Sequence, residues 1–431
     1  MVKIDERVKK IYSTLYTSKK RYFFITGGRA SLKSTNVQEF IARLTFEQGH
    51  GVLFTRYTMT SAEKSIIPEF KNVVNRLGLT PYFRFTNNKV LNIKTNSFVL
   101  FSGIKTSSGD QTANLKSISG ITTWVIEEGE DFNDERAFDT IDDSIRSSHL
   151  QNRVIWIQNP TTKEHFIYKR WIQNTSKQID VLGYNVTVSD HADVEHIHST
   201  YHLAAKLGFL SEGWIKKADT HKERAEQKHN LSKDHPQYID KHESHYYYNY
   251  IGGWLEREFG AIFTNWSEGE FNLSIPRAFG LDYGYYPDPL GFIAVSVDKR
   301  RKKVYLKEFI YSTKLSEGQV ITKVKETLIR RNDLVVVDHN EPRLTAALAK
   351  AKVNVVKAVK GKDSVIDGIR KMQEYQLIID PSSHNIKREL NNYVWNDKKQ
   401  SVPIDEFNHL IDAARYAFGR LTQERAAVRA R

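Results

Sequence analysis

The fold is first indicated by residues 22–34, which read Tyr22-Phe23-Phe24-Ile25-Thr26-Gly27-Gly28-Arg29-Ala30-Ser31-Leu32-Lys33-Ser34. The apolar run at 22–26 predicts a buried strand, and the two glycines predict a tight turn. A helical segment opens at Lys33. Strand, glycine turn and helix in this order are the context of a phosphate-binding loop, because backbone N–H groups at a helix N-terminus surround an anion.

Residues Gly27–Ser34 are therefore candidates for nucleotide binding. Lys33 would place a positive charge on the β- and γ-phosphates, and Ser34 would ligate Mg²⁺. Leu32 stands where a glycine usually precedes the lysine, so we expect a negative φ at this position. The alternative is a chance Gly-Gly turn beside a Lys-Ser pair.

A second motif, Thr123-Trp124-Val125-Ile126-Glu127-Glu128, is an apolar strand that ends in two acids. This Walker B pattern predicts that Glu127 holds Mg²⁺ through water and that Glu128 orients and deprotonates the attacking water. The alternative is a strand that meets an acidic helix start, since Glu130, Asp131, Asp134 and Glu135 follow.

Further candidates come from the next strand and from two arginines. Asn159 follows the apolar run Val154–Ile157, at the strand end where α/β sheets place ligands, and could sense the γ-phosphate. Asn159-Pro160 is also a common turn. Arg29 in the loop, or Arg146 on a helix after the Walker B strand, could stabilise the transferred phosphoryl group. Either could instead be an ordinary surface arginine.

Bulk composition fits a large nucleic-acid-binding chain. The 431 residues suit two or three domains, and the net charge of +13 favours an acidic partner, of which nucleic acid is the commonest. The absence of cysteine excludes disulfides and thiolate chemistry. No apolar run is long enough to span a bilayer and the first residues have no signal core, so we expect an intracellular soluble chain without membrane contact.

Three zones follow along the chain. Residues 1–190 carry continuous apolar runs separated by helical segments, which predict a parallel-rich sheet covered on both faces. Residues 191–272 are rich in His, Lys, Glu and Tyr, and we interpret them as a small helical linker subdomain without a buried strand. Residues 273–431 form a third domain that ends in a short basic tail.

The third zone predicts strands at 278–282, 292–298, 303–311, 334–338 and 353–359 with helices after the third strand. The order β-β-β-α-β-α-β-α is that of the RNase H-like fold. Asp282 lies on the first strand, Asp338 ends the fourth, and Asp412 lies on the last long helix. In that fold the three carboxylates can converge and hold two Mg²⁺ or Mn²⁺ ions.

Each acid has a structural alternative. A strand-end Asp is often a turn or N-cap residue, and Asp412 could be a solvated helix acid. Second-line candidates are Glu341, Asp405 and His409, with Asp405 expected as an N-cap and His409 expected to pack or to touch DNA. We expect Asp288 to be a turn residue. The turn Lys299–Lys302 could contact phosphates, or be a solvated tip.

Taken together, these residues resemble the large terminase subunits of tailed bacteriophages. The loop Gly-Gly-Arg-x-Ser-x-Lys-Ser, the Glu-Glu strand and the Asn-Pro strand look like the family's ATPase half, and the third zone looks like its nuclease half. Leu32 and Glu127 depart from the more usual Gly and Asp. The resemblance implies finger roles for Arg29 and Arg146, a coupling role for Asn159 and a nuclease triad of Asp282, Asp338 and Asp412.

The expected fold is therefore an ASCE-type P-loop ATPase domain, a helical linker and an RNase H-like nuclease domain. The resemblance implies that ATP hydrolysis packages double-stranded DNA into a procapsid and that the nuclease cuts concatemers. It also implies a small terminase subunit, a portal protein and a ring of five copies as partners. The chain would act in the host cytoplasm, at the portal vertex, and be absent from the virion. Alternatives are a cellular repair ATPase-nuclease and a non-enzymatic DNA-binding scaffold.

Overall fold

A computed structural model describes residues 11–58, 62–63, 65–106, 109–110, 119–159, 161–232, 235, 237–258, 260–358, 364–396 and 399–423. Pro160, Val359 and the basic tail lie outside these ranges. The chain divides into two compact units, Met1–Glu256 and Arg257–Arg431, which are described separately. No described helix is long and apolar enough to cross a membrane.

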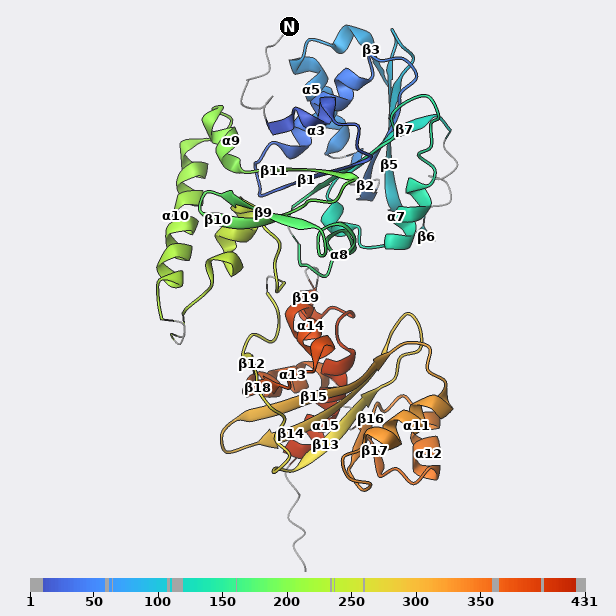
Figure 1. Cartoon of the computed structure of the whole chain (residues 1–431), viewed down its shortest axis with the longest axis vertical. Coiled ribbons are helices and arrows are strands. Elements are labelled where there is room, and N and C mark those ends of the chain that lie inside the picture. The colour runs from blue at the N-terminus through green and yellow to red at the C-terminus, as the bar shows by residue number, and fades with distance from the viewer. Residues whose placement is uncertain are drawn as a thin grey trace, which may run out of the picture. The chain divides into compact units, whose positions relative to one another are not determined.

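The N-terminal unit is built on a sheet with the strand order β11-β1-β8-β7-β2-β5-β4-β3, and β6 pairs with β5 (Figure 1). Strands from β11 to β5 in this order are parallel, and β4 and β3 are antiparallel additions. The bounds of these strands are β1 (Tyr22–Gly27), β2 (Gly51–Thr58), β3 (Phe83–Phe85), β4 (Lys89–Asn92), β5 (Phe98–Thr106), β6 (Gly109–Asp110), β7 (Ile121–Ile126), β8 (Arg153–Gln158) and β11 (Val194–Ser199).

Helices cover both faces of this sheet because its strands are apolar on both sides. Phe23 and Ile25 of β1 pack with α3 and α5, whereas Phe24 packs with α7 and α8. The bounds are α2 (Thr14–Thr17), α3 (Lys33–Leu44), α5 (Ile66–Arg76), η1 (Thr80–Tyr82), η2 (Gly129–Asp131), α7 (Glu135–Asp142) and α8 (Phe166–Trp171). Strand β8 lies between β1 and β7, as the ASCE-type arrangement requires. The predicted parallel-rich P-loop fold is confirmed.

The segment that follows α8 has a hydrophobic core of its own. Its elements are the hairpin β9 (Ser176–Val181) and β10 (Tyr184–Ser189), then α9 (Tyr201–Lys206), α10 (Glu212–His229), η3 (Lys241–Glu243) and the π-helix η4 (Tyr247–Ile251). Apolar faces of the hairpin, α10 and η4 pack together. The expectation of no buried strand after residue 191 was wrong, because β11 pairs with β1 inside the unit.

The C-terminal unit has a mixed sheet in the order β12-β18-β15-β14-β13-β16-β17. Strands β13, β14 and β15 are antiparallel neighbours, and β16 is parallel to β13. The bounds are β12 (Trp266–Glu268), β13 (Arg277–Asp282), β14 (Leu290–Asp298), β15 (Lys303–Ser312), β16 (Val335–Val337), β17 (Val355–Lys357), β18 (Gln376–Ile379) and the separate hairpin β19 (Trp395–Asn396) and β20 (Lys399–Pro403). The predicted RNase H-like fold is confirmed, and β12 and β18 are strands that the sequence pattern did not predict.

Helices α11 (Glu317–Thr327) and α12 (Pro342–Lys350) pack on one face of this sheet, while α13 (Ser364–Gln373), α14 (His384–Asn392) and α15 (His409–Thr422) pack on the other (Figure 1). Helix α15 approaches β13 closely. A Cβ added at Gly280 would stand 1.7 Å from the carbonyl oxygen of Ala413. Glycine at this position therefore lets α15 lie directly against the strand that carries Asp282.

Candidate functional sites

The phosphate-binding loop borders a pocket of about 480 Å³. Residues from three places in the sequence line it, namely Arg29–Thr35 of the loop and α3, the acids Glu127, Glu128 and Glu130 after β7, and Gln158 and Asn159 at the end of β8, together with Glu69 and Ile157. The C-terminal ends of neighbouring parallel strands thus bring the predicted nucleotide-site residues together.

Lys33 is buried at the floor of this pocket. Its ammonium group donates to the carbonyls of Gly27 and Gly28 over 2.8 Å each, to Ser31 Oγ over 3.0 Å and to Asn159 Oδ1 over 3.1 Å. Burial lowers the pKa of Lys33 to about 8, against the opposing effect of nearby carboxylates. Hydrogen bonds to residues of the phosphate-binding loop therefore fix the position of the Lys33 ammonium group.

The backbone of the loop differs from expectation at Leu32, because its φ is +62° rather than negative. Ala30 is also left-handed, with φ +57°. A side chain in this region carries a cost of about 1–2 kcal/mol per residue. The loop therefore holds strain at two non-glycine positions beside the site.

The two loop glycines are required because other backbone segments lie against them. A Cβ on Gly27 would stand 1.9 Å from the carbonyl oxygen of Ser199, and one on Gly28 would stand 2.4 Å from that of Tyr250. The N–H of Arg29 also donates to the carbonyl of Asn249 over 2.7 Å. The end of β11 and the π-helix η4 therefore enclose the loop from two sides.

A chain of hydrogen bonds links β1 to these two segments. Thr26 Oγ1 lies 2.8 Å from His196 Nε2 and 2.9 Å from His198 Nδ1. The N–H of Ser189 donates to His196 Nδ1, and His198 Nε2 lies 3.0 Å from the carbonyl of Ile251. A backbone N–H only donates and a carbonyl only accepts, so both histidines carry their proton on Nε2. Burial lowers their pKa values to about 3 for His196 and about 4 for His198.

The first Walker B acid, Glu127, is buried beside Ser34. Burial raises its pKa to about 6, and a hydrogen bond from Ser34 opposes that rise. Its Oε2 is buried and has no hydrogen-bond partner among the described residues. A hydroxyl and a carboxylate oxygen without a partner suit the hard cation Mg²⁺, so these residues fit the expected ion.

The second acid, Glu128, forms an ion pair with Arg56 near the end of β2. Its side chain is 38% exposed and lines the pocket. Glu128 has φ +52°, so the backbone turns sharply after the strand. The carboxylate is thus held by an arginine, a partner that the sequence motif did not indicate.

Asn159 connects the two halves of the pocket. Its backbone N–H and its Nδ2 donate to the carboxylate of Glu130 over 3.1 and 2.7 Å, while its Oδ1 accepts from Lys33. Glu130 is partly buried, and this burial raises its pKa. Glu130 lies in the first turn of η2, as the interpretation of an acidic helix start expects, and it also lines the nucleotide pocket.

The two candidate finger arginines differ in position. Arg29 is exposed and lines the pocket. Arg146 was expected on a helix, but α7 ends at Asp142 and Arg146 follows it as an exposed residue outside the pocket lining. Only Arg29 is therefore placed at its own chain's pocket.

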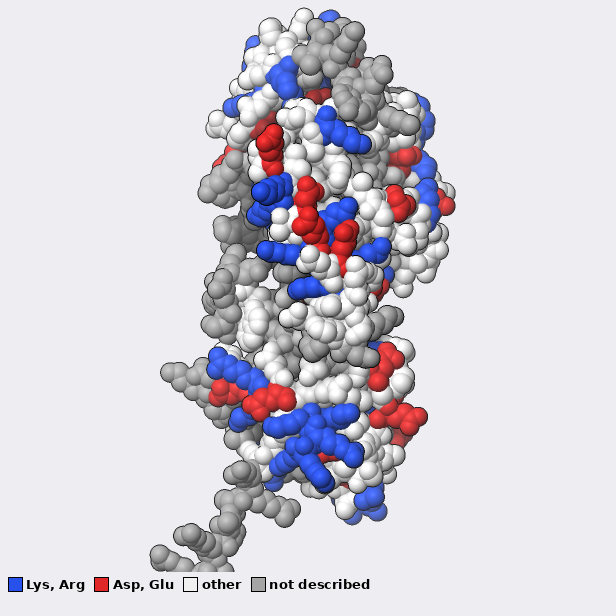
Figure 2. Space-filling model, turned by 90° about the vertical axis from the view of Figure 1, so that its left-hand side faces the viewer, with Lys and Arg blue, Asp and Glu red and all other residues white. Residues whose placement is uncertain are grey.

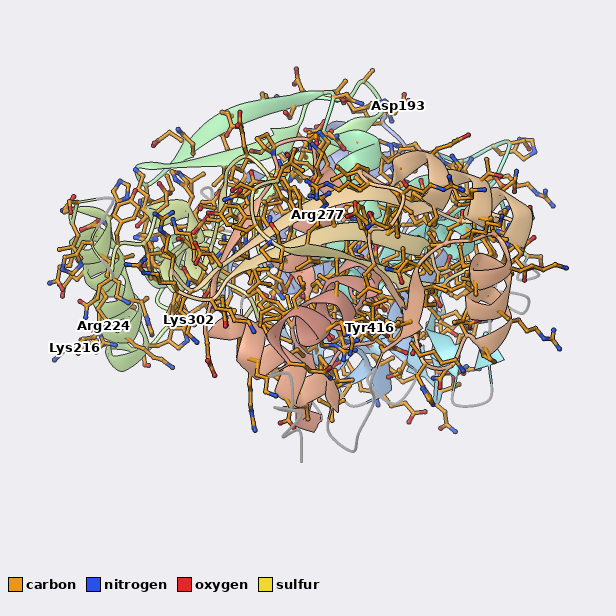
Figure 3. The ribbon with its side chains drawn as sticks, turned by 90° about the horizontal axis from the view of Figure 1, so that it is seen from below. Asp193, Lys216, Arg224, Arg277, Lys302 and Tyr416 are labelled. Atoms are coloured by element: carbon orange, nitrogen blue, oxygen red, sulfur yellow. The ribbon has the colours of Figure 1, made fainter. Side chains whose placement is uncertain are left out.

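In the C-terminal unit, Asp282 ends β13, Asp338 follows the parallel neighbour β16, and Asp412 lies in the first turn of α15. The charges of all three carboxylates affect the pKa of Tyr416 on α15, which Figure 3 labels. Burial raises the pKa of Tyr416, and the charges of Asp282, Asp412 and Asp338 raise it further. The three acids therefore lie close enough to one phenol to affect its ionisation, and Asp282 also accepts its hydrogen bond.

Two of these acids have basic side chains as neighbours. His409 Nδ1 lies 3.1 Å from Asp282 Oδ2, and Tyr416 donates to Asp282 Oδ1 over 3.3 Å. Arg415 donates to Asp412 over 3.1 and 3.2 Å. Burial lowers the pKa of His409, but Asp282 outweighs it and the net pKa is raised. His409 therefore contacts a predicted metal ligand.

Carboxylate oxygens are suitable donors for Mg²⁺ or Mn²⁺. Among the residues that the structure describes, however, no three acids or histidines stand together as a ready metal-binding group. Glu341 lies near the same acids, since burial and the charges of Asp338 and Asp282 raise its pKa. These acids are suitable ligands for the two ions. That they converge around bound ions stays a prediction.

The start of α15 is held by a buried carboxylate from α14. Glu389 Oε2 accepts from the N–H of Leu410 over 2.8 Å and from that of Ile411 over 3.0 Å. Burial raises the pKa of Glu389 to about 7, against the effect of those N–H groups and His409. The expectation that Asp405 is the N-cap of α15 was wrong, because the N-cap is Asn408. Asp405 accepts a hydrogen bond from Asn408 Nδ2.

The basic turn Lys299–Lys302 is exposed at the tip of the β14–β15 hairpin. Lys299 Nζ lies 3.4 Å from the carbonyl of Thr422, at the end of α15 away from His409. Figure 3 labels Lys302 near this tip, and Figure 2 shows Lys and Arg side chains gathered on the C-terminal unit. The turn therefore lies at the opposite end of α15 from the three acids.

Comparisons with known proteins cover both units. The family model described as phage terminase large subunit matches residues 19–234, and the model described as terminase RNase H-like domain matches residues 282–420. The chain is 28% identical over 442 residues to the large terminase subunit of Bacillus phage SPP1, covering 95% of this chain and 94% of that protein. It is 23% identical over 409 residues to the PBSX phage terminase large subunit of Bacillus subtilis strain 168, covering 92% and 89%.

Among solved structures, the nuclease domain of the SPP1 large terminase with bound Mn is 32% identical, covers 37% of this chain and 97% of that chain, and has a TM-score of 0.33. The crystal structure of the HK97 bacteriophage large terminase is 11% identical, covers 97% and 95%, and has a TM-score of 0.47.

Proposed function

This chain belongs to the phage terminase large subunit family, and from that premise we propose that it hydrolyses ATP to move double-stranded viral DNA into a procapsid and cuts concatemeric DNA with a two-metal endonuclease. The observation that carries the proposal is the convergence of Lys33, Glu127, Glu128 and Asn159 on one pocket beside the loop. A buried lysine among acids, next to the N–H groups of the loop, suits a bound nucleoside triphosphate and Mg²⁺.

Each residue of the pocket has a chemical task in this proposal. Lys33 and the loop N–H groups bind the phosphates, and Ser34 with Glu127 holds Mg²⁺, which would supply charge neutralisation at the phosphates. Glu128 orients the attacking water once Arg56 releases it. Asn159 lies between Lys33 and Glu130, so a change at the phosphates reaches the end of β8 directly.

The nuclease centre is proposed to be Asp282, Asp338 and Asp412. Two divalent cations bound there would supply electrostatic stabilisation of the cleaved phosphodiester. His409 and Tyr416 position the Asp282 carboxylate from both of its oxygens. Glu389 positions the first turn of α15, which carries His409 and Asp412.

We propose that residues 191–272 act as the linker between an ATPase domain at 1–190 and a nuclease domain at 273–431. The contact of Asn249 with Arg29 supports this role, because η4 touches the loop that binds nucleotide. Any movement of the loop on hydrolysis would therefore act first on η4.

The proposed assembly is a ring of five chains on the portal of a procapsid, with a small terminase subunit that selects DNA. It acts in the host cytoplasm and is absent from the mature virion. Arg29 would act within its own pocket, and the exposed Arg146 is free to reach a neighbouring chain's pocket. No feature of the described sites favours a repair enzyme or a non-enzymatic scaffold.

DNA protection tests this proposal. Wild type, procapsids and ATP should shield linear DNA from an added nuclease, whereas Lys33→Ala should leave it digested, because the buried charge at the phosphates is lost. Asp282→Ala should still protect DNA that is already linear. Absence of ATP-dependent protection by wild type, with the small subunit and procapsids supplied, would contradict the packaging function.

A further inference from the structure

The loop after β13, residues 283–289, displays two adjacent tyrosines. Tyr285 is 56% exposed and Tyr286 is 59% exposed, directly after the strand that ends in Asp282. Aromatic rings lose favourable apolar burial when they face water. Two exposed tyrosines, adjacent in the sequence and close after a predicted catalytic acid, therefore indicate a surface that another molecule covers.

The base of this loop is firmly held, so the rings have a fixed support. The carbonyl of Tyr285 accepts from the N–H of Lys314 over 2.6 Å. A Cβ on Gly284 would stand 2.5 Å from the carbonyl oxygens of Asp288 and Pro289, so the two sides of the loop are close-packed. Asp288 Oδ1 lies 3.7 Å from His409 Nε2, which joins the loop to α15.

The chemistry of the exposed surface matches a nucleotide. Lys314 Nζ lies 4.6 Å from the centre of the Tyr286 ring, which puts a cation beside an aromatic face. Such a pair can stack on a base while its cation meets the phosphate. The acid of the loop, Asp288, is turned to His409 instead.

The distance to the catalytic acids sets which nucleotide is contacted. Tyr285 follows Asp282 by three residues, so their Cα atoms are at most about 11 Å apart. This span corresponds to roughly three base steps along one strand at about 3.4 Å each. The rings therefore lie within reach of the bases that flank the phosphate at the acids.

We propose that Tyr285 and Tyr286 form a stacking platform for an unpaired nucleobase of the DNA beside the cleaved phosphate, with Lys314 on the backbone. The inference rests on the proposed nuclease function and adds a substrate preference to it. A paired base cannot stack on the rings without leaving its duplex, and that cost is least for a mismatched or frayed pair. The nuclease centre should therefore bind locally unpaired DNA more tightly than uniform duplex.

Fluorescent oligonucleotides test the platform directly. The full-length chain is titrated, with Ca²⁺ in place of Mn²⁺ to prevent cutting, into duplexes that carry 2-aminopurine either in a mismatch or fully paired. Wild type should quench the mismatched probe strongly and the paired probe weakly. Tyr285→Ala/Tyr286→Ala should bind the mismatched duplex about fivefold to a hundredfold more weakly and lose the quenching.

Three further variants separate the causes. Tyr285→Phe/Tyr286→Phe keeps both rings and should keep most of the quenching. Lys314→Ala removes about one phosphate contact, so the affinity of this variant should depend less steeply on salt concentration. Its quenching of the mismatched probe should persist. Tyr82→Ala removes a tyrosine that is 42% exposed in the other unit and should leave both probes unaffected. Thermal melting and ATP hydrolysis confirm that each variant is folded.

Equal affinity and quenching in the double Ala variant and wild type would overturn the platform, and would assign the rings to a protein partner instead. Equal weakening for paired and mismatched DNA would also overturn it, because the rings would then contact intact duplex. If wild type quenches the mismatched probe but never cuts with Mn²⁺, the nuclease function fails while the platform stands.

Discussion

Asn159 donates its backbone N–H and its side-chain Nδ2 to the partly buried carboxylate of Glu130, over 3.1 and 2.7 Å. Its remaining side-chain oxygen accepts from Lys33. One amide therefore joins the phosphate-binding lysine to an acid after the Walker B strand. In this arrangement, a change in the charge that Lys33 faces also alters the position of the β8 end.

Asn159→Ala should lower the rate of ATP hydrolysis by about 10- to 100-fold, because the side-chain hydrogen bond that positions Lys33 is lost and one bond to a charged group is worth about 1.5–3 kcal/mol. Cleavage of DNA should be unchanged. Steady-state ATPase and plasmid-cleavage assays on one preparation measure both effects. Asn230→Ala, an exposed asparagine at the end of α10, is the control. Wild-type ATPase in Asn159→Ala would show that the amide has no part in the reaction.

The two partly buried histidines of β11 predict loss of stability in acid. The pKa values of His196 and His198 are lowered to about 3 and about 4 in the folded chain, whereas an unfolded histidine titrates near 6.5. The unfolded state therefore binds more protons than the folded state below pH 6.5. The free energy of unfolding should decrease as the pH is lowered through that range. The two groups together should cost about 2 kcal/mol between pH 6.5 and 5.5.

Denaturant unfolding at pH 7.5, 6.5 and 5.5, followed by tryptophan fluorescence, measures this dependence. His198→Gln should show a smaller change between pH 6.5 and 5.5, and the exposed His149→Gln should match wild type. A free energy of unfolding that stays constant between pH 6.5 and 5.5 would contradict the claim that His196 and His198 are neutral in the folded chain.

Gly280 and Gly419 form a matched pair for the packing of α15. Gly280→Ala places a methyl group 1.7 Å from the carbonyl of Ala413 and should cost roughly 1–3 kcal/mol or more while abolishing DNA cleavage. A Cβ at Gly419 meets no atom of the described residues within 4 Å, so Gly419→Ala should stabilise α15 by about 0.5–1 kcal/mol. Thermal unfolding and cleavage assays compare them, and wild-type cleavage by Gly280→Ala would disprove the close contact.

The sequence was sufficient for those features that depend on local pattern. Five apolar runs predicted β1, β2, β5, β7 and β8 because strands covered on both faces are continuously apolar. The loop at 27–34 and the acids at 127 and 128 then followed from the ends of these strands. The order of the C-terminal strands likewise predicted that Asp282 and Asp338 end neighbouring strands.

Other features depend on contacts that no local pattern contains. Strand β11 was missed because His196 and His198 make it look polar, and the hydrogen-bond partners of the two rings come from other segments of the chain. Arg56 and Glu130 were missed because their partners, Glu128 and Asn159, come from other strands. The π-helix η4 had no signal, since its role comes from contact with the loop.

Glu389 predicts a sensitivity of the nuclease centre to α14. Glu389→Leu leaves the N–H groups of Leu410 and Ile411 without their acceptor, at a cost of about 1–3 kcal/mol for each buried group. More Mn²⁺ should then be needed for half-maximal cleavage, because the turn that carries Asp412 is displaced. Glu389→Gln keeps an acceptor oxygen and should restore most of the metal affinity. If Glu389→Leu retains the wild-type Mn²⁺ requirement, the positioning role is wrong.

The central claim is that one chain carries two separate active sites. Plasmid cleavage with Mg²⁺ or Mn²⁺ and ATP hydrolysis, measured side by side for wild type, Asp282→Ala and Glu128→Ala, test it most directly. Asp282→Ala should lose cleavage and keep ATP hydrolysis, and Glu128→Ala should do the reverse. If wild type shows neither activity with DNA and procapsids present, or if either substitution abolishes both activities in a folded chain, the two-site account is contradicted.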